Sequence, residues 1–237
     1  MADGLINALN PTHVFKVSPL IPDAEFSKIE YLRAFRKMAR SRWTSYGVLT
    51  DKLMWRKIDA SLVEGDVLTG HCTYGALNLR IPKIRYVTII RNPMQQFISE
   101  FKWLRHGYLK RNALKRFYHK GRLSAATTID SLLDFMTENA ELYKNPSTRY
   151  ITGRPDHPAP FKHLQENYFC FGLLDETQKF CLDFEKKTGV KVNFPHLNPS
   201  PSKSKETLSE RNLSLFKKLY ETDLDLYARI KDHLLNQ

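Results

Sequence analysis

The length and composition of the chain are those of one folded domain. It has 237 residues, of which 42% are hydrophobic and 12% aromatic, enough to bury a core and to exclude a disordered protein. It carries 37 Lys and Arg against 25 Asp and Glu, a net charge of +12. This excess of positive charge predicts an anionic partner: a nucleic acid, a membrane surface, a polyanionic glycan or a phosphorylated small molecule.

The sequence has no pattern typical of a membrane span, a secretory signal or a metal site. No apolar run approaches the roughly 20 residues that cross a bilayer, and residues 1–20 lack the basic-then-apolar order of a signal peptide. Cys72, Cys170 and Cys181 are too few and too scattered for a disulfide framework or a zinc site. We therefore expect no metal and a cytoplasmic location, or the Golgi lumen if an N-terminal anchor has been removed from this sequence.

The first part of the chain reads as short strands that alternate with helices. Residues 13–17 form a candidate strand, and helical patterns follow over 23–42 and 48–62. Residues 67–68 begin a second strand, which leads into a glycine-flanked loop at 69–75.

Residues 85–90 are the clearest strand in the sequence. They read Arg-Tyr-Val-Thr-Ile-Ile, an almost wholly apolar, β-branched run that is typical of a parallel strand covered on both faces. Pro93 suits the first turn of a helix, which we expect to reach about Leu104. Residues 102–122 contain eight Lys and Arg and no Asp or Glu. By default such a stretch is a solvated face, with an anion-binding role as the alternative.

The second half continues this alternation. We expect a helix over 129–143 and a strand over 168–172 followed by a helix to about Lys187, and residues 154–161 are a proline-rich stretch with little pattern. A last helix is expected over 208–235. Helices that alternate with strands predict an α/β fold of three layers, in which a mostly parallel central sheet is flanked by helices.

Arg91 and Ser99 are the most informative residues. Arg91 stands at the carboxyl end of the strand, where ligands of open α/β sheets bind. A guanidinium there can grip a phosphate through two N–H donors. Ser99 follows about two turns along the next helix and can face the same anion. The spacing therefore predicts that both side chains bind one phosphate group.

Arg91-Asn92-Pro93 with Ser99 at this spacing, after a Val/Ile strand, resembles the 3′-phosphate-binding motif of sulfotransferases. These enzymes use 3′-phosphoadenosine-5′-phosphosulfate (PAPS), and the likeness is to carbohydrate 2-O-sulfotransferases and small bacterial-type sulfotransferases. Other segments are similar to that family in the same order: Gly70 to Gly75, Asn145 to Gly153, Tyr168 to Glu176, and Asp223 to Tyr227.

The likeness covers roughly residues 65–235 of a single expected domain, 1–237. It implies the P-loop nucleotide-kinase-like sulfotransferase fold. The implied reaction moves a sulfuryl group from PAPS to a hydroxyl, expected on an anionic carbohydrate, and leaves adenosine 3′,5′-bisphosphate.

The resemblance also implies roles for named residues. Arg91 and Ser99 would hold the 3′-phosphate. His71, on the loop after a strand, would be the base that takes the proton of the acceptor hydroxyl. Lys203 and Lys205 lie in a Pro/Ser/Lys loop that is similar to a late basic loop near the nucleotide in related enzymes.

The chain departs from the family at the loop after its first strand. Family members have Pro-Lys-x-Gly-Thr there, and the N–H groups and lysine of that loop hold the 5′-phosphosulfate. Residues 17–24 here read Val-Ser-Pro-Leu-Ile-Pro-Asp-Ala, with no glycine or lysine after the first proline. Lys16 is the nearest replacement. Either another cation takes the place of the loop lysine, or the cofactor site is impaired.

Other interpretations stay open. A sulfotransferase fold could bind a nucleotide or polyanion without transfer, and a nucleic-acid-binding protein is supported only by the charge. Arg91 could form a structural ion pair, Ser99 could be a surface serine, and His71 an ordinary loop histidine. Phe101 and Trp103 are expected in the core rather than stacked on a base.

Overall fold

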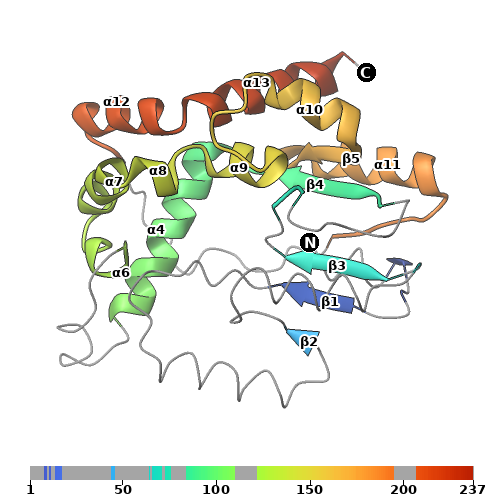
Figure 1. Cartoon of the computed structure of the whole chain (residues 1–237), viewed down its shortest axis with the longest axis horizontal. Helices are drawn as coiled ribbons and strands as arrows, with labels where there is room; N and C mark the ends of the chain where they lie inside the picture. Colours follow the sequence, from blue (N-terminus) through green and yellow to red (C-terminus); the bar gives the residue numbers. More distant parts are fainter. Residues whose placement is uncertain are drawn as a thin grey trace.

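The computed structural model describes the chain in ten pieces, and Figure 1 shows their arrangement. These are residues 8–9, 11, 14–17, 44–45, 64, 66–70, 73–75, 84–109, 122–194 and 207–236.

The strands of the described chain pair in parallel, in two sheets. The first sheet has the order β2-β1-β3 and contains β1 (Val14–Val17), β2 (Thr44–Ser45) and β3 (Val67–Gly70). The second sheet pairs β4 (Tyr86–Ile90) with β5 (Tyr168–Leu173). In Figure 1 the arrows of β1, β3 and β4 point the same way. The strands predicted at 13–17, 67–68, 85–90 and 168–172 are thus present.

β4 leads into helix α4 (Pro93–Leu109) through a two-residue junction. Oδ1 of Asn92 accepts the backbone N–H of Met94 at 3.0 Å and that of Gln95 at 3.2 Å, which are the hydrogen bonds of a helix N-cap. Proline at the first helical position has no N–H that needs a partner. The helix therefore begins where the sequence predicted, and it continues past Leu104 to Leu109.

Helices cover both faces of the β4–β5 sheet. On one face, helix α11 (Thr177–Thr188) packs Phe180 and Phe184 against Cys170 of β5. On the other face, helix α13 (Glu221–Leu235) packs Leu226 and Ile230 against Leu173 of β5. Because successive side chains of a strand point to opposite faces, Cys170 faces the cluster under α11 and Leu173 faces the cluster under α13. Helices α9 (Pro146–Thr152) and α10 (Pro160–Asn167) add Ile151 and Leu164 to the α13 side.

A second core lies among the helices beside this sheet. Phe97 and Phe101 of α4 pack with Leu132 of helix α7 (Ile129–Glu138) and Phe216 of helix α12 (Glu210–Leu219). The short helices α6 (Arg122–Ala125) and α8 (Ala140–Tyr143) border it. The core residues named here are each no more than 1% exposed, so this cluster holds α4 firmly.

Helical structure is present over the ranges expected at 129–143 and about 208–235, but each range is divided in two, so the prediction of one continuous helix in each was wrong. α7 and α8 separate at Asn139, whose side chain donates to the carbonyl of Phe135 at 2.8 Å. α12 and α13 separate at Tyr220, which is 1% exposed and stacks on Phe216. The apolar period continues across both breaks, which is why the pattern predicted one helix each time.

Several expectations lie outside the described residues. The helices expected over 23–42 and 48–62 are among them, except that Thr44–Ser45, between the two, is strand β2. The three-layer architecture and the single-domain organisation over 1–237 stay predictions. Across the portion of the chain that is described, no helix combines the length and apolar character that a bilayer crossing requires.

Candidate functional site

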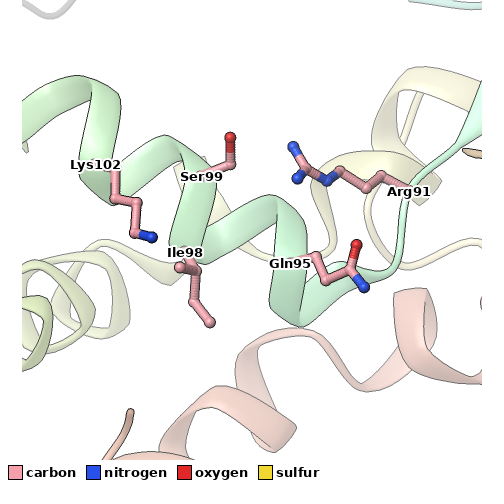
Figure 2. Close-up of a pocket in the computed structure, with 5 residues that line it drawn as sticks. All are labelled: Arg91, Gln95, Ile98, Ser99 and Lys102. Carbon is pink, nitrogen blue, oxygen red and sulfur yellow. The ribbon is translucent and has the colours of Figure 1, made fainter. Parts of the chain in front are cut away.

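Arg91 and Ser99 line the same cavity. It has a volume of about 160 Å³, and its lining is completed by Gln95, Ile98 and Lys102. Arg91 comes from the carboxyl end of β4, and the other residues come from one side of α4, where positions three and four apart are neighbours. Figure 2 shows the guanidinium of Arg91 pointing back along α4 toward Ser99.

The lining has the chemistry of an anion site. Arg91 and Lys102 supply positive charge, and Ser99 and Gln95 supply groups that can donate hydrogen bonds. None of the described lining residues is acidic. The cavity has several times the roughly 30 Å³ share of one water molecule, so a tetrahedral oxyanion fits it.

The side chain of Arg91 has an unmet bonding requirement. Its Nε is buried and has no hydrogen-bond partner, and within the described residues no ion pair includes Arg91. The Nε atoms of Arg122 and Arg149 are also buried without a partner, but the guanidinium of Arg122 forms an ion pair with Glu100. A buried donor without an acceptor costs about 1–3 kcal/mol, more if charged. The structural ion pair considered for Arg91 is thus not seen among the described residues.

None of the other predicted site residues is seen to line this cavity in the described part of the chain. His71, Lys203 and Lys205 lie outside the described residues. Lys16 lies in β1, paired in register with Ser45 of β2, and only its backbone is described. The predicted pair that can be placed is therefore Arg91 with Ser99.

Besides the apolar Ile98, two polar lining residues, Gln95 and Lys102, were missed by sequence reasoning. They stand four residues before and three residues after Ser99, so helical spacing from that serine could have identified them. Of the two aromatic residues expected in the core, Phe101 is 1% exposed, which confirms that prediction. Trp103 is 68% exposed, so for this residue the prediction was wrong.

The loop that follows β3 is anchored to the helices after β4. The backbone N–H of Tyr74 donates to the carbonyl of Tyr150 in α9 at 2.8 Å, and the Tyr74 hydroxyl donates to Oδ1 of Asn167 at 2.8 Å. The Tyr74 ring also packs edge-on against His163 of α10. Residues 73–75, which follow His71 closely in the sequence, are thus fixed against α9 and α10.

The later segments named in the sequence meet at the carboxyl ends of β4 and β5. The Tyr227 hydroxyl on α13 donates to Oδ2 of Asp175, just after β5, at 2.9 Å, and its ring packs against the cluster that contains Ile90 and Leu173. Burial, and then Asp175, raise the pKa of Tyr227. Two segments that are distant in the sequence therefore meet where β5 ends.

The described residues contain no group of three or more His, Cys, Asp or Glu side chains placed to hold a metal ion. No protein-family model matches the chain, and no curated protein matches its sequence. The support for a function therefore comes from the residues of the site.

Proposed function

We propose that the chain is a PAPS-dependent sulfotransferase that acts on a hydroxyl of a carbohydrate. The observation that carries this proposal is the cavity that Arg91 and Ser99 line together, with Lys102 and without an acidic residue among the described lining. The sequence motif places these two residue types at this spacing, and in the structure both side chains line one cavity, which supports a common ligand.

The lining fits the 3′-phosphate of the nucleotide. The planar guanidinium of Arg91 offers two parallel donors to a phosphate, the geometry of the strongest charge-assisted hydrogen bonds. The Ser99 hydroxyl adds a third donor, and the Lys102 ammonium adds a point charge. Together they match a doubly charged tetrahedral group.

The reaction assigns further roles to residues predicted from the sequence. PAPS, when bound, supplies the sulfuryl group. His71 takes the proton of the acceptor hydroxyl, because imidazole titrates near neutral pH. Lys16, Lys203 and Lys205 supply positive charge near the moving oxygens in the absence of the loop lysine.

A second candidate function is nucleotide or polyanion binding without transfer. The observation that favours it is the sequence of residues 17–24, which lacks the glycine and lysine of the family loop. Both functions need the cavity of Arg91 and Ser99. They differ only in whether the sulfuryl group moves.

Calorimetric titration with adenosine 3′,5′-bisphosphate tests the site. We expect Arg91→Ala to weaken binding about 100-fold, because it removes two charge-assisted hydrogen bonds, and Ser99→Ala about tenfold. Arg105→Ala is the matched control: it removes one positive charge from the same helix but not from the cavity lining. Wild-type affinity in the Arg91→Ala variant would overturn the proposal.

A transfer assay with radiolabelled PAPS and a panel of carbohydrate acceptors separates the two functions. A sulfotransferase transfers label, and His71→Ala abolishes transfer while it retains bisphosphate binding. Binding without transfer to any acceptor would favour the second function. If the bisphosphate does not bind and oligonucleotides bind with a steep salt dependence, the protein binds nucleic acid instead.

A further inference from the structure

One lining residue of the anion cavity differs chemically from the others. Arg91 and Lys102 can only donate hydrogen bonds, whereas Gln95 carries a carboxamide, with an NH₂ group that donates and a carbonyl oxygen that accepts. A phosphate monoester near pH 7 is mostly the dianion, which has acceptor oxygens and no proton to donate. It can therefore bind the NH₂ group of Gln95 but not the carbonyl oxygen. A donor for that oxygen has to come from another part of the ligand or from water.

Gln95 is held at the start of α4 with its side chain open to a ligand. Its backbone N–H donates to Oδ1 of Asn92 at 3.2 Å, so the residue lies in the capped first turn. Its side chain is exposed, and Figure 2 shows the carboxamide on the same side of α4 as the guanidinium of Arg91. The next residue, Gln96, differs, because its Oε1 accepts the Ser147 hydroxyl of α9 at 3.3 Å and it does not line the cavity.

A hydroxyl on the carbon next to a phosphate ester supplies the donor that a phosphate lacks. In a ribonucleoside 3′-phosphate, the 2′-hydroxyl stands on the carbon beside the one that bears the phosphate. One carboxamide can then donate to a phosphate oxygen and accept the proton of the 2′-hydroxyl. A 2′-deoxynucleotide has the same phosphate without this donor, and a site that hydrogen-bonds a hydroxyl discriminates against the analogue without it.

We propose that Gln95 selects a ribonucleotide for the anion cavity, by accepting a hydrogen bond from the 2′-hydroxyl beside the bound 3′-phosphate. Arg91, Ser99 and Lys102 bind the phosphate, which ribonucleotides and deoxyribonucleotides share. Gln95 binds the part of the sugar in which they differ. The inference deepens the proposed function and rests on it, because the 3′-phosphate has to occupy the cavity.

The test compares two ligands, adenosine 3′,5′-bisphosphate and its 2′-deoxy analogue, by calorimetric titration of the full chain. We expect the wild type to bind the ribonucleotide about tenfold more tightly, the effect of roughly one hydrogen bond. Gln95→Met keeps a long side chain that favours the helix but removes both polar groups. We expect this variant to bind the two ligands with affinities within about twofold of each other. The ratio of the affinities is the readout, because a general loss of folding or of phosphate binding lowers both alike.

Gln95→Glu tests which atom of the carboxamide binds the hydroxyl. It keeps an accepting oxygen but adds a negative charge, which repels the phosphate. We expect it to weaken the binding of both ligands and to retain a preference of about tenfold or more for the ribonucleotide, because a charged acceptor forms the stronger hydrogen bond. Loss of the preference in this variant would overturn the assignment to the carbonyl oxygen.

Two controls lie on the same helix. Gln96→Met makes the same substitution at the neighbouring residue, outside the cavity lining, and should retain the wild-type preference for the ribonucleotide. Ser99→Ala should weaken the binding of both ligands by a similar factor and also retain the preference, because its hydroxyl binds the shared phosphate.

The outcomes distinguish this inference from the proposed function. If neither ligand binds to the wild type, the proposed function fails, and the role of Gln95 fails with it. If both ligands bind equally well to the wild type, the proposed function stands and the role of Gln95 is overturned. That role is also overturned if Gln95→Met retains the preference, because another group then binds the 2′-hydroxyl. A preference that is lost in Gln95→Met and retained in both controls supports the inference.

Discussion

Asn145 and Asp223, 78 residues apart, cap each other's helices. The Oδ1 atom of Asn145 accepts the backbone N–H of Thr222 at 3.1 Å and that of Asp223 at 3.4 Å, at the start of α13. The Asp223 carboxylate accepts the N–H of Ser147 at 2.9 Å and that of Thr148 at 2.7 Å, at the start of α9. Each side chain thus satisfies donors that the other's helix leaves without an intrahelical partner.

Replacement of Asp223 by alanine should destabilise the fold strongly. The carboxylate is 1% exposed, and its loss leaves two N–H groups without an acceptor in a buried place. We expect the free energy of unfolding in urea to fall by about 3 kcal/mol. Asp225→Ala, on the same helix, removes an exposed ion pair with Arg229 and should cost less than about 0.5 kcal/mol. Similar losses for the two variants would contradict the prediction.

The reciprocal capping also predicts strong coupling between the two residues. The losses of unfolding free energy caused by Asn145→Ala and Asp223→Ala should not add in the double variant, because each substitution loosens the junction that the other side chain holds. We expect an interaction energy of at least about 1 kcal/mol in a double-mutant cycle of urea unfolding. Strictly additive effects would show that the two caps act independently.

The pH dependence of stability should contain a contribution from His163. Burial and the neighbouring His157 lower the pKa of His163 from 6.5, and the backbone of Ile151 and the side chain of Glu166 oppose them more weakly. Above pH 6.5 this imidazole is mostly neutral in both the folded and the unfolded chain. As the pH falls below 6.5, the unfolded chain takes up the proton first, so the free energy of unfolding decreases.

The measurement is urea unfolding at pH 8 and pH 5.5. We expect His163→Gln to lose less stability between these pH values than the wild type. His106→Gln, at an exposed position on α4, is the control and should retain the wild-type difference. An equal loss in the wild type and in His163→Gln would refute the assignment to His163.

Two aromatic residues of α4 should respond very differently to truncation. Phe101 is 1% exposed within the helical core, and Trp103 is 68% exposed. Phe101→Ala should lower the free energy of unfolding by about 4 kcal/mol, because it leaves a cavity in a packed cluster. Trp103→Ala should change it by less than about 0.5 kcal/mol. Chemical unfolding followed by circular dichroism checks both, and a large loss at Trp103 would show that its ring is packed.

Helix α11 packs closely on β5 because Gly172 of β5 has no side chain. A Cβ atom at this position would lie 2.9 Å from the Cβ of Phe180. Gly172→Ala should therefore cost about 2 kcal/mol, because the helix and the strand must move apart. Gly189→Ala, at the residue that caps the end of α11, is the control: nothing lies within 4 Å of a Cβ atom there, but φ is +72°, and the strain should cost about 1 kcal/mol. A smaller loss at Gly172 than at Gly189 in urea unfolding would contradict this prediction.

Much of the site could be predicted from the sequence because its signals are local. The β-branched run, the Asn92 cap and Pro93 act on immediate neighbours, so the end of β4 and the start of α4 lie where they were expected. The helical spacing then places Ser99 toward Arg91. The exposure of Trp103 could not be predicted in this way, because it depends on which side of α4 the distant helices α7 and α12 cover.

By itself, then, the sequence determined where the strand and helix around Arg91 begin and end, since those boundaries depend on neighbouring residues alone. Only the tertiary structure decided that the last helical pattern divides at Tyr220, where Asn145 accepts the first N–H groups of α13 and its own N–H donates to the carbonyl of Leu219. It also decided that the hydroxyl of Tyr227 on α13 donates to Asp175, which follows β5. These contacts join residues far apart in the chain, so they cannot be predicted from the pattern of neighbouring residues.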